Sequence, residues 1–260
     1  MVGSADIPNA STIDPAEVER FSRLADEWWD PAGKFGPLHR LNPVRLGYIR
    51  DRAAAHWQRE ALSGSPLRGL SLLDIGCGGG LICEPMARLG AHVTGIDAAE
   101  RNVATARLHA RGQELVIAYR VATAEALAQS GSRFDIVLAL EIVEHVADVD
   151  LFLEACGRLV APGGLLFLST LNRTAKAWAL AIAGAEYVLR WLPRGTHDWR
   201  KFLKPSEVVR GLGAGGIAAQ EIVGVIYNPL SRTWSLSRSD FDVNYMLYGS
   251  KAAGVRSTTN

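Results

Sequence analysis

The sequence has few of the features that would place a protein in a membrane, outside the cell or on a nucleic acid. Its three cysteines, Cys77, Cys83 and Cys156, have no metal-ligand spacing and are odd in number, which favours a reducing compartment. It contains no stretch of about 20 uncharged apolar residues, and residues 1–16 lack the apolar run of a secretory signal. The net charge of +1 provides no basic field for a nucleic acid. We therefore expect a cytoplasmic protein without a transmembrane helix or a nucleic-acid partner.

The N-terminal quarter of the chain is expected to be helical. Asp14 is followed by proline and then glutamate, which is a typical helix start, and residues 16–66 are interpreted as a helical extension. Pro37 and Pro43 predict a short loop within this extension, because proline interrupts helices. A second amphipathic helix is predicted from about Val44 to Leu62.

Residues 67–250 are expected to form the main domain, since strand-length apolar runs alternate there with helical patterns. This alternation predicts a mostly parallel sheet with helices on both faces. Residues 171–204 are interpreted as an insertion after the fifth strand, and residues 1–15 and 251–260 as flexible tails. The seven expected strands are Leu70–Ile75, His92–Ile96, Val116–Arg120, Phe134–Leu140, Leu165–Ser169, Ile217–Ile226 and Asp242–Tyr248. The expected helices of this domain are Leu81–Leu89, Ala99–Arg111, Val149–Val160 and Pro205–Leu212.

A glycine-rich turn joins the first of these strands to the next helix. Gly76, Gly78 and Gly80 permit a tight turn and a close approach of the backbone to a ligand. Their spacing differs from the dinucleotide fingerprint, and no lysine follows as in a phosphate-binding loop. Asp74, which leads the turn, would repel a phosphate and suits a cationic ligand. The turn therefore favours a sulfonium cofactor with an α-amino group, although a turn without a ligand is the alternative.

Two further strand ends extend the predicted cofactor site. Asp97 lies 21 positions after Gly76 at the end of the second strand, where a carboxylate accepts hydrogen bonds from ribose hydroxyls. After the third strand, Thr123, Ala124 and Glu125 offer a backbone amide and a short polar side chain to adenine. Helix capping is the structural alternative for both Asp97 and Thr123.

Two carboxylates and an imidazole follow the fourth strand. Glu141, Glu144 and His145 are expected at the active-site mouth, because ligands of open α/β sheets bind beyond the carboxyl ends of the strands. Two roles fit this cluster: the three side chains could bind a divalent cation such as Mg²⁺, or His145 could be a general base. Capping of the next turn is the alternative without chemistry.

The motifs together resemble those of a known superfamily. The loop Leu73–Gly80, the string Glu141-x-x-Glu144-His145-Val146 and the turn Leu159–Gly164 are similar to those of class I S-adenosylmethionine-dependent methyltransferases. Strings outside these motifs are narrower signals, and they resemble the bacterial ubiquinone-biosynthesis O-methyltransferases over residues 16–249. These strings are Trp28-Trp29-Asp30, Pro37–Arg45, Ser169–Arg173, Gly195–Trp199 and Asp242–Met246.

The resemblance implies a Rossmann-like fold, S-adenosylmethionine as the methyl donor and two acceptors, 2-polyprenyl-6-hydroxyphenol and 3-demethylubiquinol. It also implies a multienzyme complex of ubiquinone biosynthesis as a partner. Its cofactor contacts correspond to Arg45, Gly76, Asp97 and Leu140, and its metal ligands to Glu141, Glu144 and His145. A guanidinium at position 45 suits the methionine carboxylate, since arginine binds carboxylates in a bidentate manner.

The segment 176–194 lies within the predicted insertion. It is apolar, carries Trp178, Tyr187 and Trp191, and has basic residues near its ends. This composition is typical of an interfacial helix and predicts a peripheral contact with the inner membrane, where a polyprenyl acceptor would reside. A lid helix packed on the core is the alternative.

Three other functions are possible for this sequence pattern, and each is disfavoured by particular residues. A nicotinamide-dependent oxidoreductase is disfavoured by the glycine spacing and by Asp74, and a cofactor-binding scaffold without catalysis by the Glu-Glu-His cluster. A methyltransferase for another phenol or lipid is disfavoured only by the flanking strings.

Overall fold

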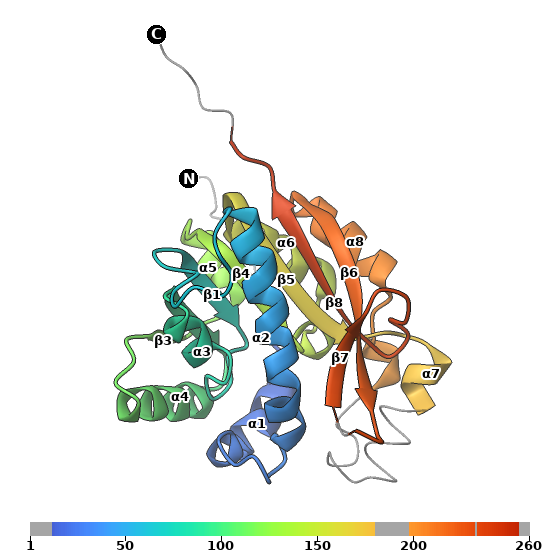
Figure 1. The fold of residues 1–260 in the computed structure, drawn as a ribbon. Coiled ribbons are helices and arrows are strands. Elements are labelled where there is room, and N and C mark those ends of the chain that lie inside the picture. Colours follow the sequence, from blue (N-terminus) through green and yellow to red (C-terminus); the bar gives the residue numbers. More distant parts are fainter. Residues whose placement is uncertain (1–11, 180–197, 232, 255–260) are drawn as a thin grey trace, which may run out of the picture.

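A central sheet of eight strands organises the protein (Figure 1). The computed structural model describes residues 12–179, 198–231 and 233–254. The strands follow the order β3-β2-β1-β4-β5-β8-β6-β7 across the sheet. Their bounds are β1 Ser71–Ile75, β2 His92–Asp97, β3 Ala118–Val121, β4 Phe134–Leu140, β5 Val160–Leu171, β6 Ile217–Asn228, β7 Thr233–Ser237 and β8 Asn244–Lys251.

The first five strands are parallel, and β8, β6 and β7 add antiparallel pairs at one side. The strand order reverses between β1 and β4, which creates the crevice where ligands of such sheets bind. The predicted sheet type is confirmed, but the predicted number of seven strands is wrong. The additional strand β7 pairs with β6 and is mostly exposed; its five residues, Thr-Trp-Ser-Leu-Ser, alternate polar and apolar side chains, and this short signal was missed.

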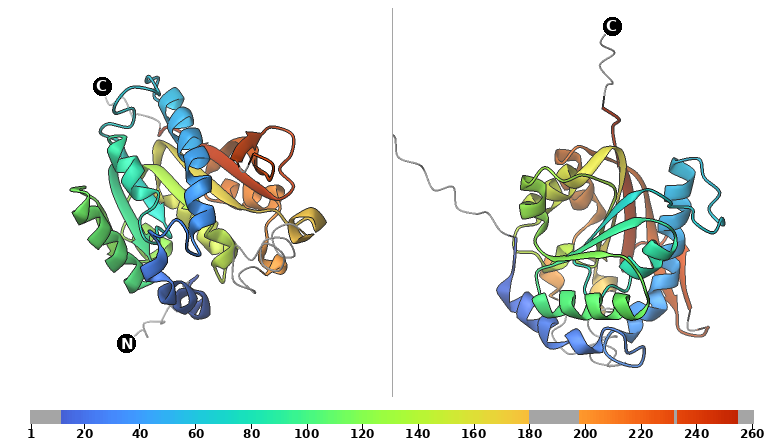
Figure 2. Two further views of the ribbon diagram at one scale, coloured as in Figure 1. Left: turned by 60° about the horizontal axis from the view of Figure 1, so that its bottom comes forward. Right: turned by 90° about the vertical axis from the view of Figure 1, so that its left-hand side faces the viewer.

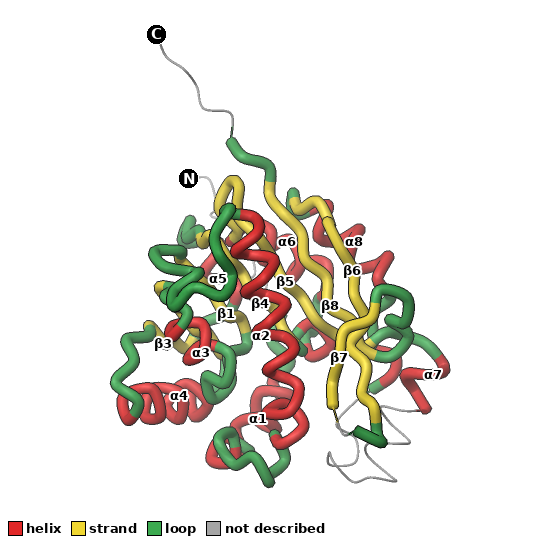
Figure 3. The backbone as a smooth tube through the Cα atoms, viewed as in Figure 1, coloured by secondary structure: helices red, strands yellow, loops and turns green. Residues whose placement is uncertain are grey.

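Helices cover both faces of the sheet (Figures 2 and 3). Successive strand residues serve opposite faces, as Leu72 and Leu73 show: each belongs to a different core cluster. One face packs against α2 (Gly36–His56), α3 (Cys83–Arg88) and α4 (Glu100–Gly112). The other packs against α5 (Ala124–Gln129), α6 (Val149–Leu159) and α8 (Pro205–Ala214).

The long helix α2 differs from its prediction at both ends. It begins at Gly36 and continues through Pro43, where a loop was expected, and it ends at His56 rather than Leu62. Proline in the first turn costs no hydrogen bond, and Pro43 removes a single helical one. The buried side of the helix packs on the sheet, and this burial outweighs the local effect of proline. Its buried residues include Leu41, Arg45, Tyr48 and Ile49.

One other local prediction is wrong. The Pro162-Gly163-Gly164 segment is not a separate turn but a bulge inside β5, where the pairing shifts from Phe134↔Val160 to Ile136↔Leu165. Gly163 accommodates the bulge with a φ of +79°. Residues 124–129 form the helix α5, which agrees with the helix cap considered for Thr123.

The first part of the N-terminal extension, helix α1 (Pro15–Arg23), lies at one end of the sheet, while α2 runs along its face (Figures 1 and 2). Helix α1 begins where predicted, and the Asp14 carboxylate accepts a hydrogen bond of 3.0 Å from the Ala16 N–H. Thr12, expected in a flexible tail, is buried and donates a 2.6 Å hydrogen bond to Glu125. The chain is therefore anchored three residues before α1.

The remaining short elements are the 3₁₀ turns η1 (Ala25–Glu27), η2 (Val143–His145) and η4 (Trp199–Lys201), and the single turn α7 (Ala175–Ala177). Most of the predicted interfacial segment, residues 180–194, lies outside the described residues. Across the part of the chain that the structure describes, no helix is both long enough and apolar enough to span a bilayer.

Candidate active site

A cavity of about 920 Å³ opens at the carboxyl ends of the parallel strands. Its walls come from the glycine loop after β1, the ends of β2 and β4, the extension α1 and α2, and strands β6 and β8. The position agrees with the crevice predicted by the strand order. Every site residue predicted from the sequence, except Gly78, lines this cavity.

The glycine loop forms the floor of one half of the cavity. The Gly76 and Cys77 N–H groups both donate to the Ile96 carbonyl, at 2.8 and 2.9 Å, and this holds the loop against β2. Gly78 has a φ of +52°, and a Cβ at this position would collide with the ring of Trp28. Glycine is therefore required here both by the backbone conformation and by the packing.

Asp97 holds the loops around it and does not cap a helix, since the N-cap of α4 is Ala99 without a side-chain cap. Its carboxylate accepts hydrogen bonds from the N–H of Gly78 at 2.9 Å and of Ala99 at 2.8 Å, so it fixes the glycine loop and the turn before α4. Burial raises its pKa, and these hydrogen bonds oppose the rise. Oδ1 also accepts from the Asn102 amide at 3.2 Å, so the acceptor capacity that remains for a ligand is on Oδ2.

Asp74 and Arg45 bring opposite charges into the same buried region. Burial raises the pKa of Asp74 to about 7, although the Cys83 thiol, which donates at 3.3 Å, and the nearby Arg45 oppose this shift. The Arg45 guanidinium lies 3.7 Å from Glu141 and donates to Asn42. Burial lowers the pKa of Arg45, while Glu141, Asp74 and Glu144 support its charge.

One guanidinium nitrogen of Arg45 is unsatisfied. The Nε atom is buried and has no hydrogen-bond partner among the residues that the structure describes. An unpaired buried donor costs about 1–3 kcal/mol, so its presence inside a cavity indicates a place for an acceptor. This is the feature that suits a carboxylate ligand.

The residues predicted to meet adenine have defined local roles. The Thr123 hydroxyl accepts from the Ala126 N–H at 3.2 Å and caps α5, as the structural alternative proposed. Glu125 is buried and accepts from Thr12, and Ala124 is buried beside it. Leu140 is buried at the end of β4 and lines the cavity.

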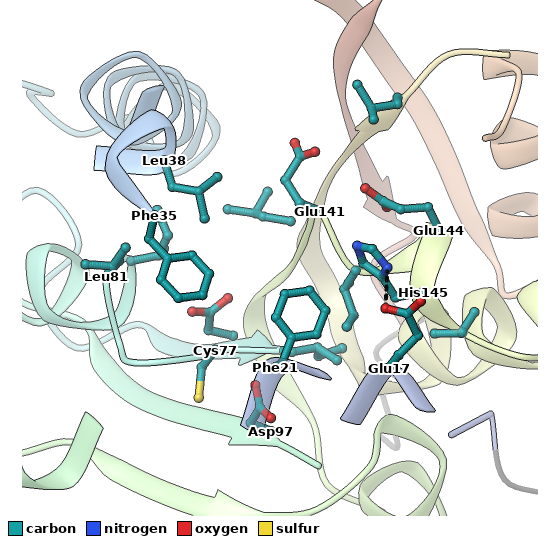
Figure 4. A pocket seen from close by; sticks show the side chains of 18 of the residues that line it. Glu17, Phe21, Phe35, Leu38, Cys77, Leu81, Asp97, Glu141, Glu144 and His145 are labelled. Carbon is teal, nitrogen blue, oxygen red and sulfur yellow. Dashed lines mark ion pairs between the residues drawn. The ribbon is translucent and has the colours of Figure 1, made fainter. Parts of the chain in front are cut away.

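Beyond β4 the three polar side chains turn in different directions (Figure 4). Glu141 has a φ of +53° and accepts a hydrogen bond of 2.7 Å from Ser169. Glu144 is buried and accepts from Thr170 at 2.9 Å, and burial together with the charge of Glu141 raises its pKa to about 7.

His145 faces the N-terminal extension instead. Its Nδ1 lies 3.2 Å from Oε2 of Glu17, and its ring makes an edge contact with Phe21 at a centroid distance of 5.2 Å.

The predicted metal centre is not formed in this arrangement. Within residues 12–179, 198–231 and 233–254, no group of three histidine, cysteine or acidic side chains is placed to hold a metal ion. The left-handed backbone of Glu141 directs its carboxylate towards Arg45, and the following 3₁₀ turn separates Glu144 from His145. The donor types suit Mg²⁺, but their positions do not.

Several cavity residues were missed by the sequence analysis. Glu17, Trp28 and Asn42 come from the extension, which offers no recognisable chemical motif. Trp28 stacks on Phe35 with ring centroids 3.7 Å apart, and its indole N–H donates to Asn102 at 3.0 Å. In the sequence, Trp28 and Trp29 indicated only the family resemblance, and this resemblance does not predict that Trp28 packs against the glycine loop.

Comparison with known proteins identifies close relatives. A family model described as a methyltransferase domain matches residues 73–168. The ubiquinone biosynthesis O-methyltransferase of Chelativorans sp. (strain BNC1) is 58% identical over 241 residues, which cover 93% of this chain and 95% of that protein. The protein of the same name from Sinorhizobium medicae (strain WSM419) is 59% identical over 237 residues, covering 91% and 95%.

Solved structures agree on the fold. A magnesium protoporphyrin IX methyltransferase from Synechocystis PCC 6803 with bound SAH has a TM-score of 0.60 at 21% identity, with 92% of this chain and 100% of that chain covered. A possible histamine N-methyltransferase from Thermotoga maritima has a TM-score of 0.59 at 18% identity, with 90% and 98% covered.

The predicted Rossmann-like class I methyltransferase fold is thus confirmed. The comparisons do not support the alternative of a nicotinamide-dependent oxidoreductase. With more than half of its residues identical to these relatives over nearly its whole length, the chain belongs to the family of ubiquinone biosynthesis O-methyltransferases.

Proposed function

We propose that this enzyme transfers a methyl group from S-adenosylmethionine to a ring hydroxyl of two acceptors, 2-polyprenyl-6-hydroxyphenol and 3-demethylubiquinol. One observation carries the proposal: a buried arginine with an unpaired donor shares a cavity with the glycine loop and Asp97. These groups match a ligand that has a carboxylate at one end and a ribose at the other. The family membership supports the choice of acceptors.

The donor half of the cavity fits the cofactor group by group. Arg45 would bind the methionine carboxylate through its free N–H, and Asp74 would bind the α-amino group. Gly76, which lines the cavity, would let the cofactor approach the backbone closely, and Asp97 would accept from the ribose hydroxyls. Leu140 and the segment 123–125 border the place left for adenine. When bound, the cofactor supplies the electrophilic methyl group.

The acceptor half supplies the base. We assign the proton of the phenol hydroxyl to Nε2 of His145, since Nδ1 faces Glu17. The freed oxygen forms its bond to the methyl carbon as the bond between carbon and sulfur breaks, and the proton remains on His145. The protein contributes by holding the oxygen and the methyl group in line, because such alignment raises the effective concentration of the reacting groups and so the rate of transfer.

The outer part of the cavity is apolar and suits an aromatic ring with a hydrocarbon tail. Strands β6 and β7 contribute Val225, Tyr227 and Trp234 to its lining, and Val243 contributes from the residue before β8. The volume of about 920 Å³ lies within the usual range for small-molecule sites, about 300–1,000 Å³. We infer that the ring binds between this lining and His145.

A contact of the segment 176–194 with the inner membrane forms part of the proposal. Large apolar side chains are exposed near the cavity lining: Trp178 is 53% exposed, Leu230 94% and Phe241 38%. They would meet the lipid from which a polyprenyl acceptor enters. Assembly with other enzymes of ubiquinone biosynthesis stays a prediction, as does the division into an extension (16–66), a main domain (67–250) and flexible tails.

The test compares His145→Ala with the matched control His56→Ala, which alters an exposed histidine outside the cavity. We expect His145→Ala to reduce methyl transfer to a short-chain demethylubiquinol by about 10²- to 10⁴-fold, the usual contribution of a general base. The affinity for S-adenosylmethionine should stay within about twofold of wild type, which corresponds to about 0.4 kcal/mol, because His145 is assigned to the acceptor half of the cavity. Turnover at the wild-type rate in His145→Ala would refute the proposed role.

A further inference from the structure

Helix α1 of the extension brings a carboxylate to the candidate base. Oε2 of Glu17 lies 3.2 Å from Nδ1 of His145, and the dashed line in Figure 4 marks this pair. The contact joins residues that are 128 positions apart in the chain, so it exists only because α1 packs over the active-site mouth. Side-chain exposure is low on both sides, 10% for His145 and 20% for Glu17.

The position of Glu17 is fixed by its surroundings. The chain before it is anchored because Thr12 donates to Glu125 and its carbonyl accepts from the Ala147 N–H at 2.8 Å. One helical turn after Glu17, Phe21 packs its ring edge-on against His145. The carboxylate and the imidazole are thus held together by packing that does not depend on their own attraction.

The charges around Glu17 keep it ionised. Burial opposes its charge, but His145, Arg20 and Lys201 together lower its pKa below the usual value. The Arg20 guanidinium lies 2.7 Å from Oε2, and the Lys201 ammonium lies 3.9 Å from Oε1. Lys201 also pairs with Asp14 at 3.1 Å, so the turn η4 is tied to the start of α1.

The carboxylate lies beside Nδ1 as a close charge contact, since Oε2 of Glu17 has no hydrogen-bond partner among the described residues; a negative charge at 3.2 Å still favours one tautomer of the ring. A neutral imidazole carries one N–H, and a carboxylate favours the tautomer whose N–H points at it. Nε2 then keeps its lone pair for the substrate. When the ring takes up a proton, the same carboxylate stabilises the imidazolium, as in carboxylate-histidine pairs of other enzymes.

We propose that Glu17 is the positioning residue of His145, and that the N-terminal extension thereby completes the catalytic machinery. Glu17 does not touch the substrate and acts through the ring it orients. The inference rests on the proposed function, because it takes His145 as the base.

The test uses three variants on one helix. Glu17→Gln keeps the size and removes the charge, Glu17→Asp keeps the charge, and Glu19→Gln is the control. Glu19 is exposed, pairs with Arg23 and does not line the cavity.

We expect Glu17→Gln to lower kcat at least about tenfold, since correct orientation of a general base is a large part of its contribution. Its KM for a short-chain demethylubiquinol should stay within about twofold of wild type, as expected when ground-state binding is unchanged. Glu17→Asp should recover part of the rate, and Glu19→Gln should match wild type.

Two further measurements distinguish an effect of Glu17 on the orientation of His145 from an effect on the stability of the fold. In a His145→Ala background, Glu17→Gln should cause no additional loss of kcat, because residues that act as a unit are not additive. The ¹⁵N shifts of histidine-labelled protein should show the Nδ1–H tautomer for His145 in wild type and a mixture in Glu17→Gln.

Wild-type kcat in Glu17→Gln, or equal effects of Glu17→Gln with and without His145, would overturn the inference. If His145→Ala loses its activity while Glu17→Gln does not, only the role of Glu17 fails. If His145→Ala itself retains activity, the proposed base fails.

Discussion

Replacing Arg45 by lysine tests the donor half of the site. Lysine keeps a positive charge beside Glu141 and Asp74 but loses the planar guanidinium, which donates to Asn42 and carries the buried, unpaired Nε. In wild type the unpaired Nε is expected to bind the methionine carboxylate. The substitution therefore removes one charge-assisted hydrogen bond while largely preserving the electrostatics of the buried cluster.

The expected effect follows from the worth of that bond. A hydrogen bond to a charged group contributes about 1.5–3 kcal/mol. At about 1.4 kcal/mol per tenfold change, the Kd for S-adenosylmethionine should rise by about 10- to 150-fold.

The assay is titration calorimetry, with Arg50→Lys as the control. Arg50 lies on the same helix, pairs with Asp51 and does not line the cavity. As a second ligand, 5′-methylthioadenosine lacks the methionine carboxylate, so Arg45→Lys should leave its affinity nearly unchanged. An unchanged Kd for S-adenosylmethionine, or an equal loss for both ligands, would refute the assignment of the carboxylate to Arg45.

Three further outcomes are expected. Because burial raises the pKa of Asp74 to about 7, the carboxyl is protonated below that pH. The affinity for S-adenosylmethionine should therefore fall as the pH is lowered from 8 to 6, and an equally steep pH dependence in Asp74→Asn would contradict this explanation. Gly78→Ala should lower Tm and weaken cofactor binding. The left-handed backbone costs a residue with a side chain about 1–2 kcal/mol, and the added Cβ would collide with Trp28. Thermal melting should show no such loss for the control Gly213→Ala, where a Cβ meets open space. Arg52 pairs with Glu221 at 2.6 Å but is partly exposed. Arg52→Gln should therefore reduce the free energy of unfolding, measured by urea titration, by at most about 1 kcal/mol. A larger loss would show that this ion pair stabilises the fold more than its exposure predicts.

The sequence predicts those parts of the fold that depend on local signals. The bounds of β4, the cap of α1 by Asp14 and the glycine loop after β1 agree with the structure, because each is encoded within a few adjacent residues.

Features that depend on tertiary packing are not predictable in this way. Helix α2 passes through Pro43 because its buried side packs on the sheet, and Thr12 is held in place because it contacts Glu125 and Ala147. Local propensity contains neither piece of information.

The site shows the same division. Asp97 and Arg45 could be named from spacing and resemblance, and the structure places both at the cavity. The three side chains predicted to hold a metal, Glu141, Glu144 and His145, are not brought together among the described residues, since proximity in sequence does not fix the directions of side chains across a left-handed residue and a 3₁₀ turn. Glu17 was missed for the converse reason, because its contact with His145 joins distant parts of the chain.

The most direct test of the account is a methyl-transfer assay with the purified protein, methyl-labelled S-adenosylmethionine and short-chain forms of both acceptors. Mass spectrometry should show one added methyl group on a ring oxygen of 3-demethylubiquinol and of the 2-polyprenyl-6-hydroxyphenol analogue. A preparation that binds S-adenosylmethionine but transfers label to neither acceptor would contradict the proposed function.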